Sequence, residues 1–284
     1  SNVGFLTTNG TLKSANELYL SAKYKPEVNI EPLLEADIFI SEKYCENASI
    51  AEWKVFLLKM GVNEDVSNKT MEVKVYDDDY NARFDKSFFD YVIESAQRYK
   101  WIAYEGWDLN NGWGCRVLGI HYDSFSFLTH CNNYNFSKLV FSRILSQYDP
   151  ETIGTNVKKV DVTTGFSRTI SQSMLTNVGC NINHFKWVIE NSPILPTVRK
   201  QCYLASDVYS NTIPHIKEIA GHYLPVLDVQ EEVSEAWQTY LGVKTHLTVH
   251  DYLLLLTEIA NDSENIDNNK NRITCIYQNL TELG

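Results

Sequence analysis

The sequence has few of the features that mark membrane, nucleotide-binding or disulfide-stabilised proteins. In 284 residues no apolar run approaches the roughly 20 residues that span a bilayer, and the run Leu253–Leu256 has only four. The phosphate-binding patterns G-x-x-x-x-G-K-[ST] and D-x-G-x-G are absent, and so is the G-x-S-x-G pattern of many hydrolases. The six cysteines include no C-x-x-C pair. We therefore expect reduced thiols and a cytoplasmic protein.

Positive charge is also scarce. The chain has 25 Lys and Arg against 36 Asp and Glu, which gives a formal net charge of -11. So acidic a chain repels nucleic-acid phosphates and anionic membrane surfaces. The short basic clusters, such as Lys158-Lys159 and Arg199-Lys200, form no stripe. We expect no membrane partner, and a nucleic-acid partner is disfavoured.

What the chain does contain is a partial internal repeat. Residues 6–19 (LTTNGTLKSANELY) return in residues 195–209, where LPT and ASDVY align with them across a one-residue gap. Each copy is followed by a helical stretch with a large aromatic residue five positions before a Gly-Val pair. These aromatic residues are Phe56 and Trp237, and we expect both, with Trp53, to anchor a core. A repeat sets the architecture, so it predicts two related small modules and favours a scaffold over a single enzyme core.

Hydrophobic periodicity completes the expected architecture, an α+β and predominantly helical fold. The first module covers residues 1–64, a central α+β subdomain covers 65–168, and a second, helical module covers 169–284. Strands are expected at residues 71–75, 115–121, 124–129 and 157–163, with a turn at Tyr122-Asp123 and a helical pattern from Thr169 onward. Helices are expected near residues 50–60, 85–99, 136–148, 184–190, 213–223, 229–241, 249–261 and 268–283.

A further series of residues resembles a known family. The series consists of SQSML at 171–175, Trp187, ILPT at 194–197, ASDVY at 205–209 and a helix ending at Gly242-Val243. It is similar to the accessory regions that follow the ATPase domain in large sacsin-like, Hsp90-type ATP-binding proteins. Residues 171–283 resemble these regions best and residues 5–62 resemble them in part, although Arg199-Lys200 stands where the family pattern has a glycine.

The resemblance implies a non-catalytic interaction or scaffold region that binds protein partners. One such partner is an ATPase domain located N-terminal to this region in the same polypeptide. The chain begins with Ser1-Asn2 and lacks an initiator Met, so we expect a fragment of a longer protein. On this reading the fragment itself is not an enzyme and holds no cofactor.

Aromatic residues are concentrated around three glycines in the central part. The four candidate residues for an interaction surface are Trp101, Tyr104, Trp107 and Trp113. Exposed aromatic side chains beside glycines make binding surfaces for peptides or sugars. A buried hairpin is the competing interpretation, since large aromatic side chains usually lie in the core.

Three groups of ionisable residues could in principle hold a metal ion. They are His246 with His250; Cys115, His121, His130 and Cys131; and Asp77-Asp78-Asp79 with Asp85 and Asp90. None has the ligand spacing of a zinc site or of an EF-hand. Surface histidines, buried thiols and a solvated loop leading into a helix N-cap explain them better, so we expect no metal.

Two other functions stay open at this point. One is a winged-helix-like nucleic-acid-binding module, which would need a basic face that the net charge disfavours. The other is a metal-dependent hydrolase or nuclease that uses the carboxylates between Asp77 and Asp90, which would need a bound metal.

Overall fold

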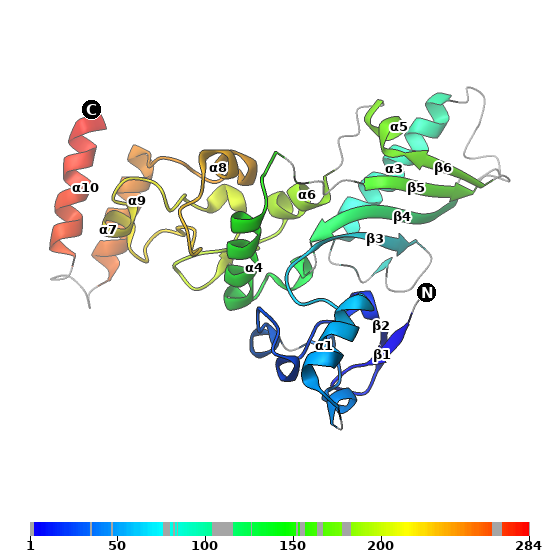
Figure 1. The fold of residues 1–284 in the computed structure, drawn as a ribbon. Helices are drawn as coiled ribbons and strands as arrows, with labels where there is room; N and C mark the ends of the chain where they lie inside the picture. Colours follow the sequence, from blue (N-terminus) through cyan, green and yellow to red (C-terminus); the bar gives the residue numbers. More distant parts are fainter. Residues whose placement is uncertain are drawn as a thin grey trace. The chain divides into compact units, whose positions relative to one another are not determined.

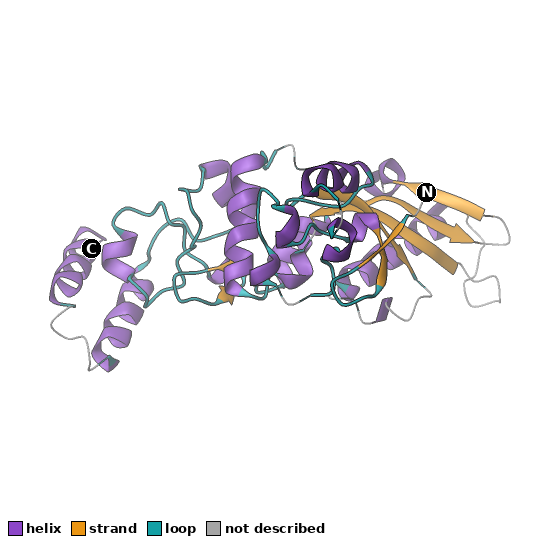
Figure 2. Cartoon of the chain, turned by 60° about the horizontal axis from the view of Figure 1, so that its bottom comes forward, coloured by secondary structure: helices purple, strands orange, loops and turns teal. Residues whose placement is uncertain are grey.

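The computed structural model describes residues 3–34, 36–46, 48–75, 80–81, 83, 85–103, 116–125, 127–151, 153, 157–163, 167–177, 183–262 and 269–283. The chain divides into two compact units, Ser1–Ser67 and Asn68–Gly284. Helices and strands are both well represented (Figures 1 and 2), which confirms the mixed α and β class. Among the described residues no helix is both long and apolar enough to cross a membrane.

The first unit combines a short hairpin, several 3-10 turns and one α-helix. Strand β1 (Gly4–Leu6) pairs antiparallel with β2 (Leu12–Ser14), and α1 covers Ile50–Lys59. Helix α1 begins where the Ser49 side chain accepts a hydrogen bond from the Glu52 N–H. The 3-10 turns are η1 (Ala15–Glu17), η2 (Ala22–Tyr24), η3 (Glu31–Leu33) and η4 (Glu42–Cys45).

One of the two aromatic anchors predicted on α1 packs against the core of the first unit, namely Trp53, which is partly buried. Leu57 of α1 is fully buried against Leu18, Leu20 and Tyr24, but Phe56 is 43% exposed. The prediction that Phe56 anchors the core is therefore wrong. Leu57 occupies the inward position, and a residue one step away on a helix points about 100° to the side.

An extended segment centred on Tyr19 crosses this unit between two other segments. Tyr19 forms parallel bridges to Phe39 on one side and to Asn63 on the other. Four backbone bonds make the crossing: Tyr19 N to Ile38 O (2.8 Å), Ile40 N to Tyr19 O (2.9 Å), Leu20 N to Asn63 O (2.9 Å) and Asn63 N to Leu18 O (2.8 Å).

The second unit contains a four-stranded antiparallel sheet in the order β3-β4-β5-β6. Helix α3 (Lys86–Ala103) connects β3 to β4 and lies behind the sheet in Figure 1. Phe88, Phe89 and Val92 of α3 share one buried core with Val73 and Ile120 of the sheet. The strands are β3 (Asn68–Lys74), β4 (Arg116–Phe125), β5 (Val157–Thr163) and β6 (Ser167–Ser171), followed by α5 (Gln172–Asn177).

Two sequence predictions are wrong in this sheet, one of a turn and one of a helix. No turn interrupts β4 at Tyr122-Asp123, because both residues are paired with β3, opposite Met71 and Thr70. The segment from Thr169 is not helical at its start, because Thr169 pairs with Asp161 in β6. In both places cross-strand pairing overrides the local turn or helix preference.

The rest of the second unit is largely helical. Helices α4, α6, α9 and α10 agree with the sequence prediction, whereas α7 and α8 are shorter than predicted. Helix α7 begins only after His215, a residue in the left-handed conformation (φ 57°), and α8 begins at the Ser234 cap. The elements are η5 (Leu128–His130), α4 (Tyr134–Gln147), α6 (His184–Asn191), β7 (Leu195–Pro196), β8 (Cys202–Tyr203), η6 (Ala205–Asp207), α7 (Ile216–Ala220), α8 (Glu235–Leu241), α9 (Val249–Asn261) and α10 (Lys270–Leu283).

A second crossing, centred on Tyr209, lies in this unit. Tyr209 forms parallel bridges to Val226 and to Lys244. Its backbone bonds are Tyr209 N to Pro225 O (3.0 Å), Leu227 N to Tyr209 O (2.9 Å), Ser210 N to Lys244 O (2.8 Å) and Lys244 N to Val208 O (2.8 Å). Each of these bonds has a counterpart around Tyr19 with the same donor and acceptor pattern.

The turn that precedes each crossing is also similar. Thr7 N donates to Thr11 O at 2.8 Å, and Thr197 N donates to Gln201 O at 3.0 Å. Within these turns Gly10 (φ 84°) and Lys200 (φ 60°) are both left-handed. Thr7 and Thr197 are separated by the same number of positions as Tyr19 and Tyr209. The structural correspondence of the two copies therefore needs no one-residue gap.

Candidate functional site

A cavity of about 310 Å³ lies at the C-terminal end of β4 in the second unit. Its polar wall comes from three separate segments of the chain: Arg83 and Asp85 before α3, Tyr122 and Ser124 in β4, and His184 at the start of α6. Its apolar wall includes Met71, Phe125, Phe127 and Leu128. An apolar hollow with a few convergent polar groups is the usual form of a small-molecule site.

Local backbone structure places the polar residues. Tyr122 and Ser124 are two positions apart in β4, so their side chains lie on the same face of the sheet. The carbonyl oxygen of Asp85 accepts hydrogen bonds from the N–H groups of Phe88 (3.0 Å) and Phe89 (3.2 Å), which fixes Asp85 at the N-terminus of α3. His184 is the first residue of α6, directly after its N-cap residue Asn183.

The imidazole of His184 connects Ser124 to Asp85. Its Nδ1 lies 2.8 Å from Oγ of Ser124, and its Nε2 is hydrogen-bonded to Oδ2 of Asp85. An ionised carboxylate can only accept, so Nε2 carries the hydrogen and Nδ1 is the acceptor. The hydroxyl of Ser124 therefore donates to Nδ1 at 2.8 Å, in preference to the Phe125 carbonyl, which lies 3.3 Å away. All three residues are buried, with exposed fractions of 8% for Asp85, 3% for His184 and 2% for Ser124.

Aromatic rings surround the imidazole. The ring centroid of His184 lies 4.8 Å from that of Tyr122, 5.0 Å from that of Phe88 and 6.0 Å from that of Phe89, with the Phe89 ring parallel to it. Burial raises the pKa of Tyr122, and the charge of Asp85 adds to this effect while Arg83 opposes it. In so apolar an enclosure the hydrogen bonds of His184 are stronger than they would be in water.

Arg83 contributes an unpaired donor to the same wall. Its Nε is buried and has no hydrogen-bond partner in the part of the chain that the structure describes. Leaving a buried donor unpaired costs about 1–3 kcal/mol, and such groups are rare in native proteins. The cavity thus combines a positive charge with an unused hydrogen-bond donor.

The backbone is strained beside the cavity. Phe127 adopts the left-handed conformation (φ 75°, ψ 0°) immediately before η5. For a residue with a side chain this conformation costs about 1–3 kcal/mol, and such residues occur preferentially at functional sites. The turn brings Phe127 and Leu128 back to the wall that also contains Ser124.

Most of the predicted aromatic surface lies outside the described residues. Trp101 lies within α3, and the other three residues, Tyr104, Trp107 and Trp113, are outside the described ranges. The buried hairpin of the competing interpretation involves the same residues.

The three predicted ionisable groups have different outcomes. His246 and His250 are exposed. His121 Nε2 lies 2.7 Å from Asp161 Oδ2, and the buried Cys131 donates to the Phe127 carbonyl at 3.5 Å. Cys115 and Asp77-Asp78-Asp79 lie outside the described residues. Within the described ranges, no group of three His, Cys, Asp or Glu residues is placed to hold a metal ion.

Asp85 and Asp90, the other members of the acidic group, serve separate purposes. Asp90 accepts hydrogen bonds from Tyr80 and from Lys86, whose Nζ lies 2.5 Å from Oδ2. Asp85 is buried and bonded to His184. Asp85 lies at the helix start, as the prediction of a loop leading into a helix N-cap has it, but it is not solvated, because the imidazole replaces the water that a buried carboxylate would lose.

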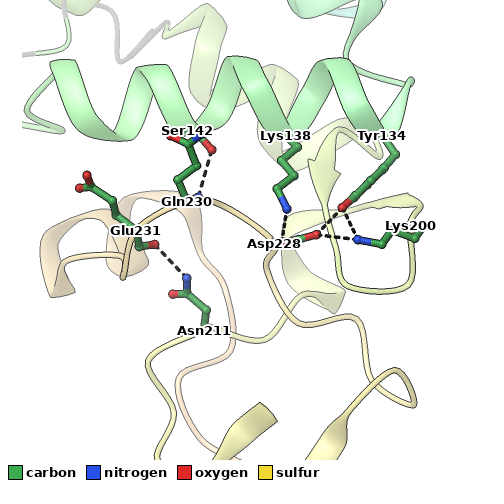
Figure 3. A network of polar contacts seen from close by, with 8 residues as sticks. All are labelled: Tyr134, Lys138, Ser142, Lys200, Asn211, Asp228, Gln230 and Glu231. Atoms are coloured by element: carbon green, nitrogen blue, oxygen red, sulfur yellow. Dashed lines mark hydrogen bonds and ion pairs between the residues drawn. The ribbon is translucent and has the colours of Figure 1, made fainter. Parts of the chain in front are cut away.

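A second polar cluster joins α4 to the segment after the Tyr209 crossing (Figure 3). Oδ1 of Asp228 accepts from Lys138 Nζ at 2.6 Å, and Oδ2 accepts from the Tyr134 hydroxyl and from Lys200 Nζ at 3.3 Å. Farther along α4, Ser142 Oγ accepts from the Gln230 N–H at 3.1 Å. Lys138, Lys200 and Asp228 are paired with one another, so these contacts stabilise the packing of α4.

A larger hollow of about 460 Å³ lies elsewhere in the second unit, between the turn at Pro150 and α8. Its lining residues include Glu151, Glu235 and Tyr240. Among the described residues, its lining contains carboxylates but no histidine, serine or cysteine. The smaller cavity at β4 therefore has more side chains that can act as a nucleophile or a base.

Sequence reasoning did not find the Ser124–His184–Asp85 cluster. His184 lies 99 residues from Asp85 and 60 residues from Ser124, so no local motif connects them. The signals that the sequence does hold are two capping patterns, the acidic residue before α3 and the Asn183-His184 pair at the start of α6.

Comparisons with models of known protein families, with curated proteins and with solved structures find no match to this chain.

Proposed function

We propose that this chain is an interaction scaffold of predominantly helical α+β architecture that binds protein partners. Two copies of one small module, in residues 1–64 and 169–284, flank the central α+β part in residues 65–168. In this proposal the chain is an accessory region of a larger sacsin-like ATP-binding protein, whose ATPase domain is one of the partners. The recurrence of one hydrogen-bond pattern around Tyr19 and Tyr209 is the observation that carries the proposal.

The recurrence supports a duplicated module because the bonds are not local. Tyr19 and Tyr209 each bridge two segments that lie far along the chain, and the loops between these segments differ in length. A shared composition would reproduce turns, but it would not reproduce the same long-range pairing. Each copy also has a Ser-capped helix followed by a left-handed glycine, Gly61 (φ 98°) or Gly242 (φ 75°).

Exposed apolar side chains support a binding role for both copies. In the first unit Leu12 is 70% exposed and Phe56 is 43% exposed. In the second unit Val249, Leu253 and Leu254, all on α9, are 49%, 53% and 41% exposed. Exposed apolar side chains that gather on one element are typical of protein–protein contact surfaces.

A cytoplasmic setting fits the cysteine chemistry. The four described cysteines, Cys45, Cys131, Cys202 and Cys275, are free thiols. Burial raises the pKa of Cys131 and of Cys202, so both thiols stay protonated and unreactive. Such thiols are typical of reducing compartments.

Partner recovery in cells tests the proposal. A tagged full chain is cross-linked and its partners are quantified by mass spectrometry, with a double variant, Leu12→Asp with Phe56→Asp, beside it. A matched control, Thr8→Asp with Ala51→Asp, adds the same charge at exposed positions of the same unit. We expect the first pair to remove a defined set of partners that the control retains. If the wild-type chain recovers nothing beyond the empty tag, the scaffold proposal is wrong.

A further inference from the structure

We propose that Ser124, His184 and Asp85 form a nucleophilic site that cleaves a small carboxylic ester in the cavity at the end of β4. This inference goes beyond the scaffold proposal and does not depend on it. The cluster lies around β4, α3 and α6, whereas the exposed apolar residues of the scaffold proposal lie in the first unit and on α9.

The hydrogen-bond directions make Ser124 the nucleophile. Asp85 holds the Nε2 hydrogen of His184, so the lone pair of Nδ1 faces the Ser124 hydroxyl at 2.8 Å. A hydroxyl beside a base that a third group orients is the arrangement of activated serine nucleophiles. Asp85 contacts Nε2 and Ser124 faces Nδ1, so the two ring nitrogens are exchanged relative to the serine protease triad, but the order serine, imidazole, carboxylate is the same.

The location of the cluster separates it from an ordinary buried histidine network. A histidine that merely fills a core is enclosed by packed side chains on every side, but all three residues here border a cavity of about 310 Å³. That volume is at the lower end of the roughly 300–1,000 Å³ of small-molecule sites. It fits a short acyl group and leaves no room for a folded protein or a long peptide.

The apolar and the polar wall suit two parts of such an ester, its acyl chain and its carbonyl group. Met71, Phe127 and Leu128 provide an apolar surface for the acyl chain. Arg83 provides a positive charge, and its buried Nε–H has no partner within the described residues. A donor of this kind can meet the negative charge that develops on the carbonyl oxygen during acyl transfer.

The reaction uses water as its second reactant. Oγ of Ser124 forms a bond to the carbonyl carbon while its proton passes to Nδ1 of His184. The bond from that carbon to the alcohol oxygen then breaks, and the alcohol leaves with the proton from Nδ1. A water molecule next gives a proton to Nδ1 and its oxygen to the acyl carbon. The carboxylic acid departs as the proton returns to Ser124.

A fluorophosphonate probe on the full chain tests the proposal. We expect the intact mass of the wild type to rise by one probe adduct, which maps to the peptide that contains Ser124. Ser124→Ala should show no adduct, and Ser142→Ala should retain it because Ser142 is buried on α4 and bonds to Gln230 instead. An unlabelled wild type, or equal labelling of Ser124→Ala, overturns the proposal.

Turnover and a conservative variant give independent readouts. The wild type should hydrolyse p-nitrophenyl butyrate faster than Ser124→Ala does. Asp85→Asn keeps the shape of the side chain but favours the wrong imidazole tautomer, so labelling should slow by about 10²–10⁴-fold. Should Ser124→Ala fail to fold, the position of the adduct on the wild type still shows whether Ser124 is the residue that reacts. If Asp85→Asn is folded and labels at the wild-type rate, the assigned roles are wrong.

Discussion

The ammonium group of Lys138 lies 2.6 Å from Oδ1 of Asp228, and this contact attaches α4 to the segment that follows the Tyr209 crossing. The backbone holds the same residue, because the Asp228 N–H donates to the Pro196 carbonyl at 2.9 Å. Asp228 thus connects the strand β7 to α4. Its carboxylate is 17% exposed, so water only partly screens its charge.

Replacing the Asp228 carboxylate should loosen this attachment. We expect Asp228→Asn to lower the free energy of unfolding by about 1 kcal/mol, because the half-buried Lys138 loses its charged partner, whereas Lys200 is 67% exposed and contributes little. Urea unfolding measures the loss. Glu232→Gln, at an exposed position four residues away, is the control and should change the free energy by less than about 0.5 kcal/mol. An Asp228→Asn midpoint equal to that of the control would contradict this reading.

The same carboxylate should make stability depend on pH. Burial alone would raise the pKa of Asp228, but hydrogen bonds from Lys138 and Tyr134 outweigh it and hold the pKa below its ordinary value. A lowered pKa means that the unfolded chain binds the proton more tightly. The stabilisation is therefore complete above about pH 4, the ordinary value, and is lost as the pH falls through the lower pKa of the folded state.

Unfolding curves between pH 6 and pH 2.5 check this dependence. The difference in unfolding free energy between the wild type and Asp228→Asn should be constant down to about pH 4 and should shrink below it. A difference that grows on acidification would show that the carboxylate is not held in its charged form.

Aromatic truncations should separate the real core residues from the apparent ones. Trp237 is 4% exposed and packs edge-on against Tyr240 at 5.5 Å, so Trp237→Ala should cost about 3–5 kcal/mol. Phe56 is 43% exposed, and we expect Phe56→Ala to cost about 1 kcal/mol or less. Thermal unfolding ranks the two, and equal losses would contradict the burial difference.

Helices and strands with a clear period could be predicted from the sequence. The apolar face of α9 and the Thr248 cap gave its bounds, Val249–Asn261, and the alternation in β5 gave Val157–Thr163. The continuity of β4 could not be predicted, because Asp123 looks like a turn residue. Its carboxylate is instead bonded to Thr70 on β3 (2.6 Å) and paired with Lys158 on β5 (2.9 Å). Partners on neighbouring strands decide this, and they lie 53 and 35 positions away.

The candidate site was beyond sequence reasoning for the same reason. Ser124, His184 and Asp85 belong to three elements, and the packing of α3 and α6 around β4 is what brings them together. Local chemistry predicted a helix N-cap in the acidic segment before α3, but it predicted no cap at Asn183. It could not predict that the two caps meet, since that depends on how the aromatic residues Phe88, Phe89 and Tyr122 pack around the imidazole.

Paired glycine substitutions test whether the two modules are equivalent. Gly61 (φ 98°) and Gly242 (φ 75°) both adopt the left-handed conformation just after a Ser-capped helix. A Cβ at Gly61 would meet no atom within 4 Å, and one at Gly242 would meet only Lys186 Nζ at 3.9 Å. Steric contact therefore adds nothing, and the cost of alanine is the cost of the conformation, about 1–2 kcal/mol.

We expect Gly61→Ala and Gly242→Ala to lower the free energy of unfolding of their own units by similar amounts, each about 1–2 kcal/mol. Gly61→Asn and Gly242→Asn are the matched controls and should cost less, because asparagine adopts the left-handed conformation more readily than alanine does. Urea unfolding of the full chain gives all four values. A loss at one glycine with none at the other would mean that the two helices end differently. The resemblance between the crossings would then not extend to the helices that follow them, and the duplicated module would be confined to the extended segments around Tyr19 and Tyr209.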